Sequence, residues 1–339
     1  MTNIVVIGAG SWGSAIATAL MRARQKNGKT KQITVLARRQ ASVDALAAGC
    51  CLHLPETPPA MPIAATTDPA CLDNANLIFV AAPVVANQAS FLMINNRQKD
   101  QQKNGQKNQG LTTIVLCAKG IGKADDGSAM LLTDLADKIL PGQPLAVLSG
   151  PSFADEVFAG LPAALVTASH APAISIQIQD AFEGSNLRLY NNNDPVGVAL
   201  AGAMKNVIAI AAGCAVGAGF GDNAKAAILT RGLAEIARFA ALMGAKPDTI
   251  FGLAGVGDLA LTCAGPHSRN MAFGMALGRG EEPPSKLAEG SRTVAQLVEL
   301  AKSKGVDLPI TNAVDRLVNH DQDLHEIVAS LLARRAGTE

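Results

Sequence analysis

A lone lysine interrupts a long apolar run near the middle of the chain. Between Leu200 and Gly213, only Lys205 and Asn206 have polar side chains. The alanine content and spacing of this run indicate a buried helix. Burying an ammonium group without a partner is costly, and such groups often take part in proton transfer. Lys205 is therefore a candidate acid and base; the alternative is a lysine whose stem packs while its ammonium group reaches water.

A glycine-rich turn near the N-terminus predicts a dinucleotide site. Gly8, Gly10 and Gly13 form the pattern G-x-G-x-x-G between a strand-like segment, Asn3–Ile7, and a helical pattern, Ser14–Arg24. In this context the first glycine permits a tight turn, the second lets a pyrophosphate approach, and the third lets the helix pack on the strand. The start of the helix then offers free N–H groups to the phosphates.

The end of the second predicted strand, Ile33–Ala37, favours NADP over NAD. An NAD site usually has an acidic residue there, which binds the ribose 2′-hydroxyl. This chain instead has Arg38 and Arg39. Guanidinium groups bind phosphate well, so the pair suits a 2′-phosphate, and the alternative is two exposed surface arginines.

Several polar residues could hold a phosphorylated substrate. Lys119, Gly150 and Ser152 follow predicted strands, at the sheet edge where doubly wound folds bind ligands. Later in the chain, a glycine-rich turn carries Asp258, and the triplet 268–270 places an arginine between a hydroxyl and an amide. Such a donor set is suited to phosphate.

The order of strand and helix patterns predicts an α/β fold in two domains. The first half alternates short β-branched runs with helical stretches, which is typical of a doubly wound, Rossmann-type parallel sheet. The predicted strands are Asn3–Ile7, Ile33–Ala37, Leu77–Ala81, Thr113–Cys117, Leu145–Leu148 and Ala163–Ala168. After Pro195 only helical patterns follow, chiefly Val198–Ala212, Asn223–Met243 and Thr293–Lys304. We expect a dinucleotide-binding domain at 1–193 and an all-α substrate-binding domain at 194–339.

Composition narrows the possible functions. The net charge of +1 and the 17% of charged residues argue against a general nucleic-acid or membrane-surface binder. The six cysteines have no metal-binding spacing, so we expect reduced, mostly buried thiols and no metal. The sequence has no secretory signal pattern and no apolar run that we expect to span a membrane, which favours a cytoplasmic protein. Residues 95–110 lack apolar side chains and are expected to form a mobile surface loop.

Nine sequence blocks, in order along nearly the whole chain, resemble the bacterial-type, NAD(P)-dependent glycerol-3-phosphate dehydrogenase family. They are GAGSWG (8–13), AKG (118–120), SGPSFA (149–154), GAMKNV (202–207), GFGDNA (219–224), TRGLAE (230–235), GVGDL (255–259), SRN (268–270) and EG (289–290). The resemblance implies the reversible reduction of dihydroxyacetone phosphate to sn-glycerol 3-phosphate, which supplies glycerophospholipid synthesis. It also implies a homodimer.

The resemblance assigns roles to residues by position. Lys205 would be the proton donor and acceptor, assisted by Lys119. Cofactor-binding residues would be Gly8, Gly10, Ser11, Trp12, Gly13, Arg38, Arg39, Lys119, Ala154, Arg269 and Glu289. Substrate-binding residues would be Lys119, Gly150, Ser152, Lys205, Asp258, Ser268, Arg269 and Asn270. The alternative is a related 2-oxo or 3-hydroxyacid dehydrogenase, such as a ketopantoate reductase, and a more distant one is an NADP-binding protein without catalysis.

Overall fold

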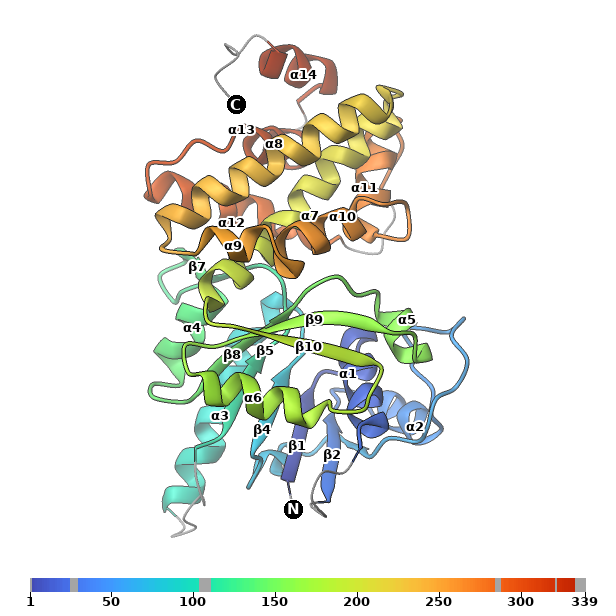
Figure 1. The fold of residues 1–339 in the computed structure, drawn as a ribbon, viewed down its shortest axis with the longest axis vertical. Coiled ribbons are helices and arrows are strands. Elements are labelled where there is room, and N and C mark those ends of the chain that lie inside the picture. The colour runs from blue at the N-terminus through green and yellow to red at the C-terminus, as the bar shows by residue number, and fades with distance from the viewer. Residues whose placement is uncertain (1, 25–29, 104–110, 284–287, 321, 333–339) are drawn as a thin grey trace. The chain divides into compact units, whose positions relative to one another are not determined.

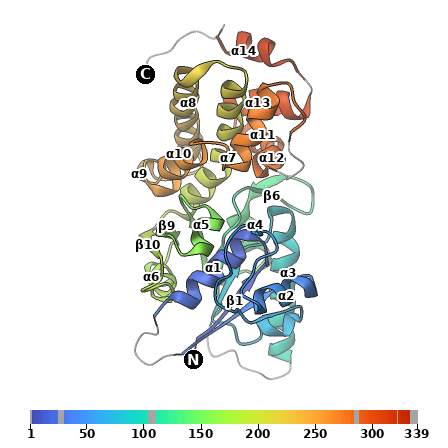
Figure 2. The same ribbon diagram turned by 90° about the vertical axis from the view of Figure 1, so that its right-hand side faces the viewer.

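The chain folds into two compact units, which are described separately (Figures 1 and 2). The first comprises Met1–Gly122 and Leu131–Ala199, and the second Lys123–Met130 and Leu200–Glu339. The structure is a computed structural model that describes residues 2–24, 30–103, 111–283, 288–320 and 322–332. The sequence suggests a single cut after residue 193, whereas the contacts also assign the short segment 123–130 to the second unit.

An eight-stranded sheet forms the centre of the first unit, in the order β10-β9-β8-β5-β4-β1-β2-β3. The strands are β1 (Thr2–Ile7), β2 (Lys31–Leu36), β3 (Ala65–Thr66), β4 (Leu77–Val80), β5 (Thr113–Leu116), β8 (Leu145–Ser149), β9 (Ala163–Ala168) and β10 (Leu187–Asn192). All six predicted strands are present. The two others, β3 and β10, lie at the two edges of the sheet.

One strand pair departs from the predicted parallel arrangement. β9 runs antiparallel to β8, with Ser149 opposite Val166, while β10 runs parallel to β9. A parallel return needs a crossover that packs on the sheet. The connection at 150–162 holds one helix, α5 (Ala154–Ala159), whose 6 residues span only about 9 Å, too short to carry the chain back along β8, so the chain turns back beside β8. The α/β, doubly wound class is confirmed, with a mixed sheet.

The strand order defines where a ligand can bind in this unit. From β1 the chain moves outward to β2 and β3, and then returns to β4 on the opposite side of β1. In doubly wound sheets, ligands bind outside the carboxyl ends of the strands at such a reversal. The switch point of this sheet therefore lies between the ends of β1 and β4.

Helices cover both faces of the sheet. They are α1 (Ser11–Arg22), α2 (Gln40–Ala47), η1 (Pro69–Leu72), α3 (Val84–Lys103), α4 (Leu132–Ile139), α5 and α6 (Pro172–Ala181). Alternate strand residues such as Val6 and Phe79 form a buried cluster with side chains of α1, α5 and α6. Phe79 meets Phe182 edge to face, with 5.7 Å between ring centroids. The other strand residues point to the opposite face, where α3 and α4 pack against one another.

Helix α3 corrects one expectation. Residues 95–103 continue this helix rather than forming a loop, and residues 104–110 lie outside the described part of the chain. Gln, Lys and Arg are good helix formers even without apolar neighbours. The buried side chains of Phe91 and Ile94 hold the preceding turns in the core. Arg97 extends the anchoring, since its Nε donates to Asp73 Oδ1 at 2.9 Å.

The second unit is helical throughout its main part, as predicted. Its helices are α7 (Pro195–Gly217), α8 (Gly221–Leu242), α9 (Pro247–Ile250), η2 (Leu253–Gly257), α10 (Asp258–Thr262), α11 (Arg269–Gly278), α12 (Glu289–Ser303), α13 (Pro309–Asn319) and α14 (Leu324–Leu332). α7 begins in the first unit and continues through the second. A small ribbon of β6 (Ile121–Lys123) and β7 (Ala129–Leu131) occupies the residues at which the chain enters the second unit and leaves it again.

Reciprocal glycines bring α7 and α11 into backbone contact. A Cβ atom at Gly213 or Gly217 would collide with a carbonyl oxygen of α11, at Met271 or Met275 respectively. In the opposite direction, a Cβ atom at Gly274 would collide with a carbonyl oxygen of α7. Both helices therefore carry small-xxx-small spacing on the contact face. This close approach positions the first turn of α11 beside the lysine turn of α7.

Helix α7 requires a second correction. By length and composition it could span a bilayer, although we expect no such run from the sequence. However, 89% of its most apolar 18-residue window is buried inside the structure. A core helix of a globular protein meets the same criterion, because its apolar surface packs against other helices.

Candidate active site

The three glycines of the first turn have different surroundings. Gly8 has φ 111°, and a Cβ atom there would lie 3.0 Å from the carbonyl oxygen of Ala81. A Cβ atom at Gly13 would collide with the carbonyl oxygen of Gly8. Nothing in the described residues lies within 4 Å of a Cβ atom placed on Gly10. The outer glycines thus allow tight packing, while the middle one leaves open backbone that a dinucleotide can approach.

The start of α1 suits an anion. Gly10 is its N-cap, and the first turn carries no acidic side chain that would offset the positive end of the helix dipole. Ser11 and Trp12 are half-buried in this turn. The Ser11 hydroxyl donates to the carbonyl oxygen of His53 at 3.3 Å, which brings the loop around His53 next to the turn.

The two arginines after β2 are exposed. Arg38 and Arg39 follow the strand end, and Arg39 is the N-cap of α2. The segment between β2 and α2 contains no carboxylate. Both guanidinium groups are thus available for a phosphate at this strand end.

A second group of predicted residues meets at the ends of β5 and β8. Lys119 Nζ donates to the carbonyl oxygen of Gly150 at 3.1 Å, and the Ser152 hydroxyl donates to the same oxygen at 3.2 Å. Gly150 has φ 132°, a conformation that glycine adopts readily. Ala154 follows as the first residue of α5. Lys119, Gly150 and Ser152 therefore form one cluster within the first unit.

Lys205 is held by two polar partners inside the second unit. Its Nζ lies 2.6 Å from Asp258 Oδ1 and donates to the Thr262 hydroxyl, also at 2.6 Å. Lys205 is only 7% exposed and Asp258 only 1%. The ammonium group is therefore charge-paired and hydrogen-bonded, which is the arrangement that makes burial of a charge tolerable.

Short helix α10 explains this geometry. It begins at Asp258, and Thr262 lies four residues later, so both side chains project from the same helix face. The Thr262 hydroxyl also donates to the Asp258 carbonyl oxygen at 2.6 Å. Thr262 is absent from the predicted site residues, although its i, i+4 spacing from Asp258 is a sequence signal that points to it. Burial raises the pKa of the nearby Cys263 thiol to about 12 even though the Lys205 ammonium lowers it, so this thiol stays neutral.

A chain of amide hydrogen bonds extends from the residue after the lysine. Asn270 Nδ2 donates to Asn206 Oδ1 at 2.9 Å, and the Gly290 amide donates to Asn270 Oδ1 at 2.9 Å. Asn206 Nδ2 in turn lies 3.5 Å from Glu289 Oε2. These bonds tie α7, α11 and the start of α12 together. The structure thus joins Asn270 and Glu289, which we predicted separately, through Asn206, which we had not placed in the site.

The remaining predicted residues lie at the start of α11. Ser268 is its N-cap, and its hydroxyl accepts a hydrogen bond from the Met271 amide. Arg269 is the first residue of the helix and is exposed. A cationic side chain beside a helix N-terminus is well suited to a phosphate.

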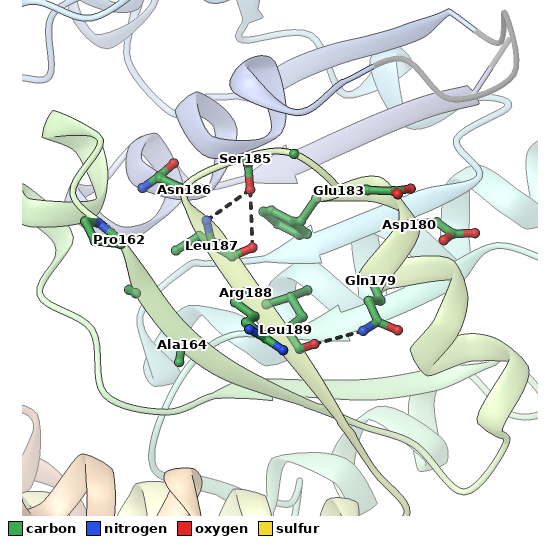
Figure 3. Close-up of a pocket in the computed structure, with 13 residues that line it drawn as sticks. Pro162, Ala164, Gln179, Asp180, Glu183, Ser185, Asn186, Leu187, Arg188 and Leu189 are labelled. Atoms are coloured by element: carbon green, nitrogen blue, oxygen red, sulfur yellow. Dashed lines mark hydrogen bonds between the residues drawn. The ribbon is translucent and has the colours of Figure 1, made fainter.

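Two hollows lie elsewhere in the two units. One, of about 750 Å³, runs along β10 (Figure 3). There Gln179 Nε2 donates to the Leu189 carbonyl oxygen, and the Leu187 amide donates to the Ser185 hydroxyl. The other, of about 1000 Å³, is a mainly apolar groove in the second unit. None of the predicted site residues lines either hollow.

The described residues contain no group of three or more His, Cys, Asp or Glu side chains that could hold a metal ion. All six cysteines are free thiols: four are buried, and Cys50 and Cys71 are half-exposed. The predicted site residues offer lysine, arginine, carboxylate, hydroxyl, amide and backbone groups.

These features define a dinucleotide-dependent dehydrogenase. The doubly wound sheet carries an open glycine turn, and the helical unit holds a buried lysine–aspartate pair. The chain belongs to the NAD-dependent glycerol-3-phosphate dehydrogenase family. The family's N-terminal model matches residues 3–175 and its C-terminal model matches residues 194–329.

Similar proteins carry the name of the same enzyme family. The glycerol-3-phosphate dehydrogenase (NAD(P)+) of Mesorhizobium japonicum is 39% identical over 99% of this chain and 94% of its own length. That of Afipia carboxidovorans is 38% identical, over 98% and 97%. The crystal structure of glycerol-3-phosphate dehydrogenase from Coxiella burnetii has a TM-score of 0.86 at 33% identity, covering 98% of this chain and 99% of its own. A ketopantoate reductase from Ralstonia eutropha, at 15% identity and a TM-score of 0.57, shares the fold alone.

Proposed function

We propose that this chain catalyses the reversible reduction of dihydroxyacetone phosphate to sn-glycerol 3-phosphate, with NADPH preferred over NADH. The single observation that carries the proposal is the buried Lys205, held at 2.6 Å by both Asp258 and Thr262 in a member of this family. The product would feed glycerophospholipid synthesis. A cytoplasmic homodimer without a membrane anchor, with a cofactor domain at 1–193 and a substrate domain at 194–339, fits this role.

The first unit would supply most of the cofactor site. The glycine turn (Gly8, Gly10 and Gly13), with Ser11 and Trp12, would receive the pyrophosphate, because Gly10 leaves its backbone open and α1 presents its positive end. Arg38 and Arg39 would bind the 2′-phosphate. Lys119, Ala154, Arg269 and Glu289 complete the proposed cofactor set. When bound, the reduced nicotinamide supplies a hydride to the substrate C2 carbon.

Lys205 would donate and accept the proton. As the C2 carbonyl oxygen gains negative charge, the Lys205 ammonium stabilises it and donates a proton; in the reverse direction, neutral Lys205 removes that proton. Asp258 orients the ammonium group, and the Thr262 hydroxyl accepts one of its hydrogens. Arg269, with Ser268 and Asn270, would hold the substrate phosphate, and Lys119, Gly150 and Ser152 would contribute further contacts.

Substitution of the lysine tests this assignment. Lys205→Met should retain NADPH binding and lose turnover by at least about 100-fold, since general acid–base groups contribute about 10² to 10⁴. Lys225→Met is the matched control in the same unit, because Lys225 pairs with the exposed Asp222 and has no proposed role. A Lys205→Met enzyme with a near-normal kcat would refute the role.

A substrate panel tests the alternative reaction. NADPH oxidation at 340 nm should occur with dihydroxyacetone phosphate and not with ketopantoate. The opposite pattern would favour the ketopantoate reductase alternative, and NADPH binding without turnover of any substrate would favour a non-catalytic role. Paired assays with NADPH and NADH on the Arg38→Ala and Arg39→Ala variants test cofactor preference. The ratio of kcat/KM for NADPH to kcat/KM for NADH should fall by about tenfold or more, because each variant loses one guanidinium group for the 2′-phosphate.

A further inference from the structure

A fully buried asparagine follows β4 and has no part in the proposed mechanism. Asn87 lies in the first turn of α3. Its Nδ2 donates to the carbonyl oxygens of Ala82, at 3.0 Å, and Pro83, at 2.9 Å. The Ala86 amide donates to the Pro83 oxygen as well, at 2.8 Å. The Asn87 side chain therefore clamps the turn between β4 and α3 from beneath.

This turn forms one wall of the switch point. β1 and β4 are neighbours at the reversal of strand order, so their carboxyl ends flank the crevice in which such sheets bind ligands. On the β1 side lies the glycine turn. A Cβ atom on Gly8 would lie 3.0 Å from the carbonyl oxygen of Ala81 and 3.1 Å from the amide nitrogen of Ala82. The two turns are thus packed backbone to backbone, with no room for a side chain between them.

Asparagine at position 87 makes the fold less stable than leucine would, if side-chain burial and helix propensity alone are considered. Asn87 Oδ1 is buried and has no hydrogen-bond partner in the described residues. A buried unsatisfied acceptor destabilises the fold, and leucine would both avoid that cost and suit a helix better. The gain that offsets these costs is the pair of hydrogen bonds to the turn.

We propose that Asn87 is a positioning residue for the dinucleotide. Its two donors fix the β4–α3 turn so that it and the glycine turn together present the shape that the cofactor needs. The proposal rests on the proposed cofactor site. It concerns a residue that does not touch the cofactor and acts through the backbone of Ala82 and Pro83.

The test compares two substitutions in the same helix. Asn87→Leu removes both donors to the turn. Ser90→Ala is the matched control, since Ser90 is also buried and donates to the Ala86 carbonyl oxygen at 2.9 Å. NADPH affinity is measured by titration of the protein fluorescence, and KM values with each substrate at saturation of the other.

Asn87→Leu should raise the Kd and the KM for NADPH at least tenfold, while the KM for dihydroxyacetone phosphate stays within twofold. Ser90→Ala should leave all three within twofold. A merely structural role would lower the melting temperature without this split. An Asn87→Leu protein that is folded and binds NADPH within twofold of the native protein overturns the proposal.

A second measurement covers the case in which Asn87→Leu does not fold. Hydrogen exchange of the native protein should show slower exchange at 82–91 when NADPH is added, and unchanged exchange there would overturn the proposal. The proposed function is tested separately, by NADPH binding to the native protein. If that binding is absent, the cofactor site itself is wrong; if it is present and Asn87→Leu matches it, only the role of Asn87 is wrong.

Discussion

The lysine–aspartate pair allows a quantitative prediction for Asp258→Asn. The substitution keeps the size of the side chain and removes the charge 2.6 Å from Lys205 Nζ, at a position where Asp258 is only 1% exposed. Removing one partner of a buried ion pair costs about 3–5 kcal/mol. The lysine can escape by losing its proton, which for an ordinary lysine costs about 4.6 kcal/mol at pH 7. The two costs are similar, so we expect the free energy of unfolding of Asp258→Asn to be about 3–4 kcal/mol below that of the native protein at pH 7.

The pH dependence follows from the same comparison. At pH 9 the deprotonation of an ordinary lysine costs only about 1.9 kcal/mol. The folded variant would hold fewer protons than its unfolded chain, so its stability should rise with pH. The deficit relative to the native protein should therefore shrink to about 2 kcal/mol at pH 9.

The assay is urea unfolding followed by circular dichroism at pH 7 and pH 9, with kcat/KM measured in parallel. Asp222→Asn is the matched control, because Asp222 pairs with Lys225 at 2.7 Å but is 90% exposed, and exposed pairs contribute little. Activity of Asp258→Asn should fall by about 100-fold or more. A buried, charge-paired lysine is ruled out if Asp258→Asn is no less stable than Asp222→Asn, or if the stability deficit of Asp258→Asn grows from pH 7 to pH 9.

Three further predictions concern helix packing, a buried carboxyl group and the glycine turn. Gly274→Ala should destabilise the fold by about 2 kcal/mol, since its methyl group meets the Ile210 carbonyl oxygen, whereas Gly265→Ala, with open space, should not; thermal melts compare them. Burial raises the pKa of Glu235, so the folded chain binds this proton more tightly than the unfolded chain and loses stability as pH rises from about 4.5 through the folded pKa. The melting temperature of Glu235→Gln, measured relative to the native protein, should therefore rise between pH 4 and pH 8. Parallel melting-temperature curves for the two proteins would contradict this. Gly10→Val should leave the melting temperature nearly unchanged while raising the Kd for NADPH at least tenfold, and tight binding would place the cofactor elsewhere.

Local patterns predicted most of the framework. Apolar β-branched runs predicted six strands, and the long helix around Lys205 followed from its alanine-rich, apolar composition. The edge strand β10 was missed because it has no β-branched run. Its alternation of buried leucines with exposed Arg188 and Tyr190 is the signal that could have found it. The helical extension of α3 was missed because the lack of apolar side chains at 95–110 was read as a loop. That lack argues only against contact with the core, and an exposed helix remains compatible with it.

The partners of each chemical group were harder to predict. Lys205 and Thr262 are 57 residues apart, and only the packing of α10 against α7 makes them neighbours. The same holds for Asn206, Asn270 and Gly290, which meet because paired glycines let α11 approach the backbone of α7.

The α/β class, the glycine turn and the unusual lysine in an apolar helix can all be predicted from local sequence, which leaves that lysine either catalytic or with its ammonium group reaching water. These features depend on local composition and spacing, which a single chain displays directly. Three features emerge from the folded chain alone: Lys205 is buried with a carboxylate and a hydroxyl, β9 runs antiparallel to β8, and Asn87 holds the turn opposite Gly8. Those outcomes depend on contacts between distant segments, and such contacts are selected by the packing of the whole unit rather than by any local pattern.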